Sequence, residues 1–174
     1  TPTPTPAPIG EGIPISSVVY PIAFSMGNDI YLMNSDGTGL ANLTNNPSDE
    51  WAYNPRWSPD GTKIVYISQG DIFSIGSDGT GQVRFTDYEG NGKWSGNPTW
   101  SPDGNKIAYE SDGDIYVMNA DGTGQVNFTN TAEGVWAAYP TWSPNGVYIA
   151  YTQVGDVYVM DSDGSDKTNI TKSD

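Results

Sequence analysis

The side chains able to do chemistry in this sequence are almost all carboxylates, since its 174 residues include 21 acidic and 7 basic residues, no His and no Cys. Ordinary nucleophilic catalysis needs a base such as His beside its nucleophile, or the thiol of Cys, and there is no Gly-x-Ser-x-Gly element. Metal sites built on imidazole or thiolate are excluded for the same reason. The composition therefore predicts a protein that is not an enzyme.

Most of the acidic residues stand where the chain is expected to turn, rather than in one cluster. Paired carboxylates can hydrolyse glycosidic bonds, but an Asp in a turn usually accepts hydrogen bonds from its own backbone. We therefore predict a structural role for the turn aspartates, which are Asp36, Asp60, Asp78, Asp103, Asp121 and Asp163.

Calcium is the metal ion that this chain would favour, because Ca²⁺ takes oxygen ligands. The candidate ligands are Asp161, Asp163 and Asp166, in the segment Asp-Ser-Asp-Gly-Ser-Asp. The segment departs from the EF-hand pattern, since Gly follows the second acid and no later Glu closes the loop. An ordinary hairpin turn is the alternative. No other cofactor is expected.

Three Trp residues are candidates for ligand binding. Trp51, Trp94 and Trp136 each stand four residues before a proline, in the segment that leads from one repeat to the next. Clustered aromatic rings can bind a sugar or a peptide. The alternative is that each ring wedges between adjacent repeats, as expected of a feature that recurs at equivalent positions. A second set is predicted to lie in the core: Trp57, Trp100 and Trp142.

The chain opens with TPTPTPAP, whose prolines hold it extended, so residues 1–11 are predicted to be a stiff linker. Thr-Pro tracts also carry O-linked glycans on exported proteins, which makes Thr1, Thr3 and Thr5 candidate glycosylation sites beside the simpler interpretation of an unmodified linker. Asn-x-Thr sequons are present as well, at Asn42, Asn127 and Asn169. We expect these asparagines to be fourth-strand residues without sugar.

The formal charge of −14 limits the partners of this chain. So acidic a surface repels phosphate backbones and anionic lipid, and we expect neither nucleic acid nor an anionic membrane as a partner. No apolar run approaches the roughly 20 residues of a membrane-spanning helix, so membrane insertion is not expected. The chain starts without Met, which is consistent with removal of a signal peptide or of a longer upstream region.

The sequence is periodic from about Gly12 onward. Trp-Ser-Pro begins at Trp57, Trp100 and Trp142, at intervals of 43 and 42 residues, and a period of about 42 fits the four strands of a propeller blade. Asp-Gly turns between short alternating segments predict antiparallel hairpins. The third segment of each repeat is apolar on both faces, as in DIYVMN at 114–119, so each sheet needs cover on both sides.

Sheets stacked face to face around an axis provide that cover. We therefore predict an all-β fold, a β-propeller of four four-stranded antiparallel blades per chain, completed by another chain if four blades do not close a ring. The first repeat lacks the Trp-Ser-Pro turn, but residues 13–17 (IPISS) are a candidate first strand. The predicted propeller covers 12–174, with blades at about 12–53, 54–96, 97–138 and 139–174.

The intact repeats, such as PTWSPDGNKIAYESDGDIYVMNADGTGQVNFT at 98–129, resemble the repeat of the TolB-like propellers, which are related to WD-repeat proteins. The resemblance covers about residues 12 to 174. It implies a bacterial or archaeal exported module for binding or scaffolding, hence a secreted, cell-surface or periplasmic protein. It does not include the additional N-terminal domain of TolB, so a role in that protein's envelope complex is not expected.

Three functions are compatible with these features. The first is a non-catalytic propeller that acts through protein contacts and self-assembles into a dimeric ring or a filament, because unclosed end blades expose apolar faces. The second is a module for binding a sugar or peptide, carried on the Thr-Pro stalk. The third is an accessory propeller of a larger hydrolase.

Overall fold

The computed structural model describes residues 21–87 and 93–172, and within these ranges it contains fifteen β-strands and no helix. The strands form four antiparallel sheets, each with its strands in sequence order; one sheet is three-stranded and three are four-stranded. We call the sheets blades 1 to 4.

The strands of blade 1 are β1 (Pro21–Met26), β2 (Asp29–Asn34) and β3 (Ala41–Asn42). Those of blade 2 are β4 (Ala52–Trp57), β5 (Lys63–Ser68), β6 (Asp71–Gly76) and β7 (Val83–Arg84). Those of blade 3 are β8 (Ser95–Trp100), β9 (Lys106–Ser111), β10 (Asp114–Asn119) and β11 (Val126–Asn127). Those of blade 4 are β12 (Ala137–Trp142), β13 (Tyr148–Gln153), β14 (Asp156–Asp161) and β15 (Thr168–Asn169).

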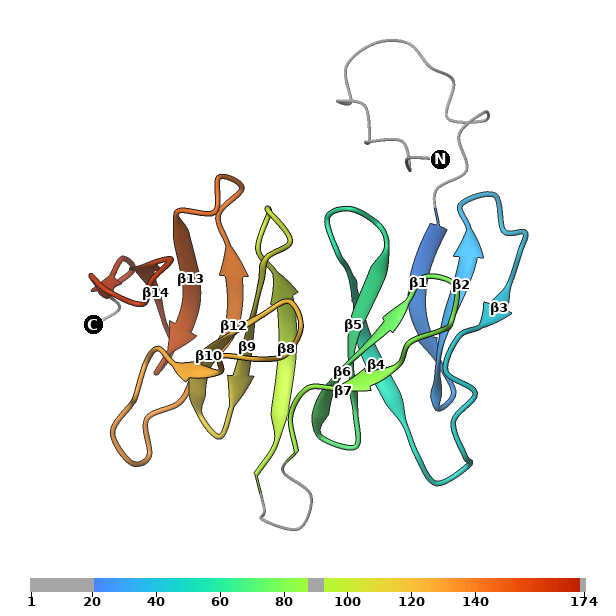
Figure 1. The fold of residues 1–174 in the computed structure, drawn as a ribbon. Helices are drawn as coiled ribbons and strands as arrows, with labels where there is room; N and C mark the ends of the chain where they lie inside the picture. The colour runs from blue at the N-terminus through green and yellow to red at the C-terminus, as the bar shows by residue number, and fades with distance from the viewer. Residues whose placement is uncertain (1–20, 88–92, 173–174) are drawn as a thin grey trace, which may run out of the picture.

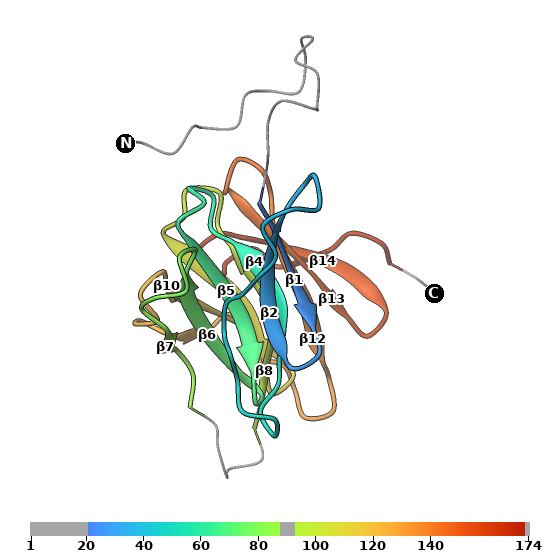
Figure 2. The same ribbon diagram turned by 90° about the vertical axis from the view of Figure 1, so that its right-hand side faces the viewer.

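The four blades stand side by side along an arc, with blade 1 at one end and blade 4 at the other (Figure 1). Figure 2, turned by 90°, shows the stack from its end, with blade 1 toward the viewer. The first strand of each later blade contacts the blade before it: β4 contacts β1, β8 contacts β5, and β12 contacts β9. β4, β8 and β12 also contact one another in succession. We call these three the inner strands. The all-β architecture of antiparallel blades predicted from the sequence is confirmed.

Side-chain hydrogen bonds fix the tight turn after each inner strand. In blade 2 the Asp60 carboxylate accepts bonds from the Ser58 hydroxyl at 2.6 Å and from the Thr62 amide at 3.0 Å. Gly61 follows Asp60 with a φ of 69°, a conformation that glycine adopts without steric cost. The corresponding contacts in blades 3 and 4 measure 2.5 and 2.7 Å. The Ser-Pro-Asp-Gly sequence therefore forms this turn by local chemistry.

Each inner strand carries a bulge, where its register with the neighbouring strand shifts by one residue. The residue before the strand's proline is left-handed there, with φ of 57° at Asn54, 46° at Asn97 and 55° at Tyr139. Asn tolerates this conformation far better than a bulky residue such as Tyr. A bulge re-aims side chains, and these three residues make the contacts among β4, β8, β9 and β12 described below.

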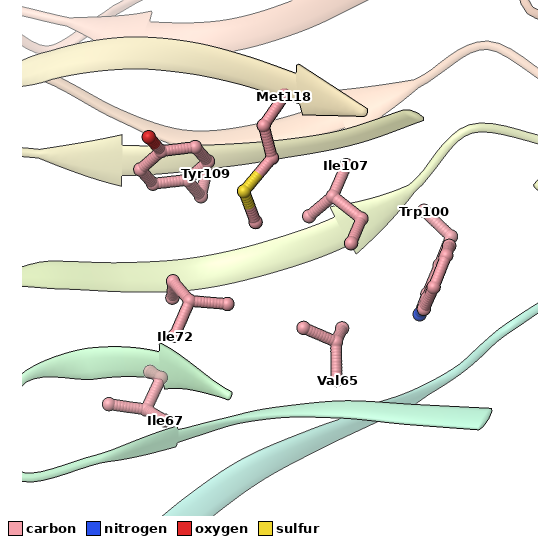
Figure 3. Packing of buried hydrophobic residues seen from close by; sticks show 7 residues of the cluster. All are labelled: Val65, Ile67, Ile72, Trp100, Ile107, Tyr109 and Met118. Atoms are coloured by element: carbon pink, nitrogen blue, oxygen red, sulfur yellow. The ribbon is translucent and has the colours of Figure 1, made fainter. Parts of the chain in front are cut away.

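The apolar core lies between the blades. Because side chains alternate along a strand, each blade has an upstream face, toward the blade before it, and a downstream face, toward the blade after it. Blades 2 and 3 meet through a cluster whose members are all at most 8% exposed: Val65, Ile67, Ile72, Trp100, Ile107, Tyr109 and Met118 (Figure 3). Similar clusters fill the other two junctions.

The described part of blade 1 has three strands, and the predicted first strand at 13–17 lies outside the described residues. The inner strands begin two residues before the predicted blade boundaries, because their first amides bond to the turn of the preceding blade. The Ser95 amide donates to the Gly70 carbonyl at 2.7 Å, and the Ala137 amide donates to the Gly113 carbonyl at 2.8 Å.

Candidate functional site

The turn aspartates accept hydrogen bonds from the residues that follow them. In blade 3 the Asp121 carboxylate accepts a bond from the Thr123 hydroxyl at 2.6 Å and one from the Thr123 amide at 3.0 Å. These bonds lower the pKa of Asp121, and the hydroxyl contributes most. Equivalent bonds at Asp36 and Asp78 lower the pKa of those carboxyls. A structural role in turns accounts for these side chains.

The candidate calcium ligands lie at the turn between β14 and β15. The Asp163 carboxylate accepts bonds from the Ser165 amide at 2.9 Å and hydroxyl at 2.6 Å, as in the other blades. Asp166 is left-handed, with a φ of 50°, and Asp161 ends β14. Within 21–87 and 93–172, no three acidic side chains gather closely enough to hold a metal ion. Calcium binding by Asp161, Asp163 and Asp166 stays a prediction.

Another aspartate closes each blade, and the sequence analysis did not assign it a role. At the start of β10, Asp114 accepts bonds from the Asn127 amide at 2.8 Å, the Thr129 hydroxyl at 2.7 Å and the Thr131 backbone amide at 2.7 Å. Burial alone would raise the pKa of Asp114, but these hydrogen bonds outweigh it and leave the pKa lowered. The bonds tie the third strand to the fourth.

The side chains of the sequon asparagines are therefore hydrogen-bonded to these aspartates. Asn42, Asn127 and Asn169 donate their side-chain amides to a carboxylate at 2.7, 2.8 and 2.7 Å. In blade 2, Arg84 stands at this position and pairs with Asp71 at 2.5 Å. The sequence signal was an Asp followed by Asn thirteen and Thr fifteen residues later. This bonding favours the interpretation of the asparagines as strand residues without sugar. Thr1, Thr3 and Thr5 lie outside the described residues.

The predicted core Trp residues differ in burial. Trp100 is 8% exposed and donates its indole N–H to the Arg56 carbonyl of the preceding blade at 3.2 Å, so its core placement is confirmed. Trp57 and Trp142 are only half-buried, although both pack against core clusters. A groove of about 470 Å³ runs between the first turns of blades 2 and 3 beside Trp100, and Lys63 contributes to its polar lining.

The candidate ligand-binding Trp residues stand immediately before the inner strands, at the end of the blades opposite the Ser-Pro turns. Trp51 is 42% exposed and Trp136 59% exposed, whereas Trp94 is half-buried. The Trp136 ring lies next to Gly113 in the turn of the preceding blade, where a β-carbon on Gly113 would be 3.6 Å from it. The ring is thus partly packed between blades and partly open to solvent. Ligand binding by these residues stays a prediction.

The inner strands and β9 together assemble residues that the sequence analysis missed. The Asn54 amide donates to the Asn97 side-chain oxygen at 3.0 Å, and the Asn97 amide donates to Glu110 at 2.6 Å. The other Glu110 oxygen accepts the Tyr139 backbone amide of blade 4 at 3.0 Å. Glu110 is only 5% exposed, while Tyr53 nearby is 39% and Tyr139 is 65% exposed. A buried carboxylate is therefore bonded to the backbone of a residue whose aromatic ring is exposed.

The upstream face of blade 1 is built like an internal junction but has no blade against it among the described residues. Ile22, Phe24, Tyr31 and Met33 occupy the positions held in blade 3 by residues of the core cluster. The ring centroids of Phe24 and Tyr31 lie 6.0 Å apart, and those of the matching pair of blade 3 lie 5.7 Å apart. Ile22 is nevertheless 44% exposed, whereas its counterpart Ile107 is fully buried.

The downstream face of blade 4 has the complementary pattern. In blade 3 this face is covered, with Ala108 and Ile115 fully buried and Val117 2% exposed. The corresponding side chains of blade 4 are each only half-buried: Ala150, Val157 and Val159. The two ends of the stack therefore present the two halves of a blade junction.

Antiparallel sheets stacked around inner strands define the β-propeller class. The family profile of the TolB β-propeller domain matches residues 16–174, and the chain belongs to this family. A solved structure described as TolB from Agrobacterium tumefaciens superposes with a TM-score of 0.71 at 25% identity, covering 88% of this chain and 61% of that one. TolB from Acinetobacter baumannii gives 0.65 at 23% identity, with 86% and 41% covered.

The same fold occurs in enzymes. An oligogalacturonate lyase in complex with manganese has a TM-score of 0.66 at 17% identity, with 83% of this chain and 48% of the lyase covered. A puromycin-hydrolyzing peptidase of Mycobacterium tuberculosis has a TM-score of 0.69 at 14% identity, with 89% and 30% covered. The present chain covers less than two thirds of the length of each of these four chains. A search among curated protein sequences gives no match.

Proposed function

We propose that this chain is a non-catalytic, exported propeller that acts through protein–protein contacts and associates with a second copy of itself through its end blades. The observation that carries the proposal is the pair of exposed end faces. Each has the residues of an internal junction, and each is uncovered among the described residues. Exposed apolar faces of this kind mark interaction surfaces.

The partner surface follows from the internal junctions. At the junction of blades 2 and 3, the aliphatic downstream residues Val65 and Ile72 pack against the upstream residues Ile107 and Tyr109. Blade 4 offers Val157 and Val159 on its downstream face, and blade 1 offers its own isoleucine and aromatic pair upstream. The downstream face of one copy therefore fits the upstream face of another.

Closure of a ring by two copies explains how such contacts become stable. Fully burying one large apolar side chain contributes about 1.5–3 kcal/mol, and association costs at least about 4 kcal/mol in lost freedom of movement. Two chains that close a ring form two equivalent junctions but lose their freedom of movement only once. Its eight blades lie within the range of about four to eight known for propellers. An open head-to-tail series would form a filament instead.

The proposal of an export role rests on the family, on the charge of −14 and on the Thr-Pro tract. Across the two described ranges, there is no helix with the length and apolar character needed to span a membrane. The secreted, cell-surface or periplasmic location is part of the proposal. The peptidase among the similar structures keeps the third function, an accessory propeller of a larger hydrolase, as an alternative that a catalytic domain in the full reading frame would support.

The test is the solution mass of the purified chain by light scattering, with negative-stain microscopy of the same sample. We expect a discrete species of about twice 18.7 kDa. Phe24→Lys alters the upstream end face and Val157→Lys the downstream end face, so each variant alone should be a monomer. Val126→Lys is the matched control, since Val126 is 52% exposed on β11, away from both end faces.

Mixing the two variants gives the decisive result. Each retains one intact end face, so an equimolar mixture of Phe24→Lys and Val157→Lys should form a heterodimer through one junction. Open-ended filaments of the unaltered chain would also support self-association, with head-to-tail growth in place of closure. A stable monomer at high protein concentration, or no effect of either end-face variant, would overturn the proposal.

A second candidate is a ligand-binding module for a sugar or peptide. The specific observation in its favour is the exposure of aromatic rings at the inner strands, where Trp51 stacks on Tyr53 with ring centroids 5.2 Å apart. Exposed aromatic rings of this kind supply apolar contact area and a face for stacking.

A further inference from the structure

Glu110 is the buried charge that the blade architecture does not require. The residues at its position in the other blades are Ser25, Ile67 and Thr152, none of which carries a charge. Burying a carboxylate is costly unless it is bonded or paired. A charged residue at a position that uncharged residues fill in the other blades therefore calls for an explanation beyond the fold.

A hydroxyl is sufficient for the structural part of this role. In blade 1 the Ser25 hydroxyl accepts the Asn54 amide of the next blade at 3.2 Å. One oxygen of Glu110 does the same for the Tyr139 amide at 3.0 Å, and the other reaches the Asn97 side chain. Both donors are neutral, so neither balances the charge. Each carboxylate oxygen has more than one lone pair, which leaves acceptor capacity.

The charge has no cationic partner among the described residues. The ion pairs found there join Arg84 to Asp71 and Asp87, and Lys93 to Asp112. The field of Glu110 nevertheless reaches the inner surface. Burial raises the pKa of the Tyr53 hydroxyl, and the nearby Glu110 carboxylate raises it further.

The surroundings of Glu110 are aromatic. Its carboxylate would lie 3.1 Å from a β-carbon placed on Gly96, and the Trp94 ring would lie 2.9 Å from the same β-carbon. Tyr139, whose amide bonds to Glu110, is 65% exposed. The electron-rich faces of such rings attract an ammonium or guanidinium group.

We propose that the inner strands bind the cationic side chain of a basic peptide, an arginine or lysine, with Glu110 supplying the charge and the rings of Tyr53 and Tyr139 the contacting faces. The net charge of −14 draws such a peptide toward the protein. Acidic peptides and nucleic acids are disfavoured by the same charges. This surface lies apart from the end faces, so the inference does not depend on self-association.

Titration calorimetry with an acetylated Gly-Arg-Arg-Gly amide tests the proposal on the full chain. The same peptide with citrulline in place of arginine keeps the shape and removes the charge. We expect Glu110→Gln to weaken binding of the arginine peptide about tenfold, and the citrulline peptide to bind weakly to both proteins. Free arginine serves to separate recognition of the side chain alone from recognition within a peptide.

Two further variants keep the result interpretable. Asp166→Asn removes one exposed charge at a turn distant from Glu110, and Asn is at ease at a φ of 50°. It should leave the affinity within about twofold, as expected of a screened surface charge. Tyr139→Asn restores the residue found at the bulges of blades 2 and 3, so it should fold while weakening binding several-fold.

The outcomes separate the causes. Equal losses for Glu110→Gln and Asp166→Asn would mean that general electrostatic attraction explains binding, which overturns the site. Equal binding of the arginine and citrulline peptides would overturn the cationic class. If Glu110→Gln failed to fold, the Tyr139→Asn variant with both peptides would still decide the matter. If Glu110→Gln loses peptide binding but keeps the mass of a dimer, peptide binding and self-association are independent.

Discussion

The outer turns of the blades and their inner strands follow opposite rules. At the turns the same chemistry recurs in every blade, as in Asp121 with Thr123 and Asp163 with Ser165. Along the inner strands the equivalent residues differ. Tyr53, Gly96 and Ala138 share one position, and the residues paired with them on the adjacent strands are Ile67, Glu110 and Thr152. Repetition therefore marks what builds a blade, and departures from it mark where a specific surface can arise.

The largest test of this contrast is a cavity in a repeated core position. Ile115 is fully buried between blades 3 and 4, so Ile115→Ala should lower the free energy of unfolding by about 2–5 kcal/mol. Urea unfolding followed by Trp fluorescence measures the loss. The matched control is Val157→Ala, the counterpart in blade 4, which is only half-buried and should cost much less in the monomer. Equal losses at the two positions would contradict the difference between inner and end blades.

A smaller effect is expected at the aspartate that closes blade 3. Asp114→Asn replaces a carboxylate that accepts three hydrogen bonds, and should cost about 1–2 kcal/mol at pH 7. Because the folded-state pKa of Asp114 lies below its ordinary value of 3.8, the stabilisation is complete above that pH. It is lost as the pH falls through the lower folded-state pKa.

The difference between the unaltered chain and Asp114→Asn should therefore shrink below about pH 3.8. Urea midpoints measured between pH 7 and pH 2 follow this change. Asp166→Asn, which alters a residue with no such set of bonds, provides the baseline. A difference that stayed constant down to pH 2 would show that the carboxylate charge is not what ties β10 to β11.

The smallest effect is expected where the inner strands depart from repetition. A β-carbon at Gly96 would meet the outer edge of the Trp94 ring at 2.9 Å, so Gly96→Ala should displace that ring. The flexible end of a side chain can move, and we expect less than about 1 kcal/mol of lost stability. Trp emission should shift to longer wavelength as the ring becomes more hydrated. A loss comparable with that of Ile115→Ala would mean that this position belongs to the core.

The fold was predictable because each blade repeats the same turn sequences and the same alternation of apolar residues. The predicted third segment at 114–119 matches β10. The Ser-Pro-Asp-Gly turn and the apolar alternation encode these elements locally. The predicted blade boundaries lie two residues after the start of each inner strand, because the first amide of the inner strand bonds to the preceding blade.

The inner surface was less accessible to sequence reasoning. The sequence showed Trp51 and Trp136 as repeated aromatics but gave no sign that Glu110 is buried between Asn97 and Tyr139, which are 13 and 29 residues away. Its position is unusual in one blade only, so periodicity hides it. The bulges add a second obstacle, because a left-handed residue reverses the alternation that predicts which side chains face inward.

The fourth strands have a consequence for behaviour in concentrated solution. β3, β7, β11 and β15 are each two residues long, and the amide of the second residue of the third strand donates to a threonine hydroxyl, as Ile115 does to Thr129 at 2.9 Å. The rim of each described blade therefore offers very little ladder on which a foreign strand could grow, which is a recognised protection against amyloid-like aggregation. A protein that exposes apolar faces at its two ends can in this way resist uncontrolled polymerisation along its outer rim.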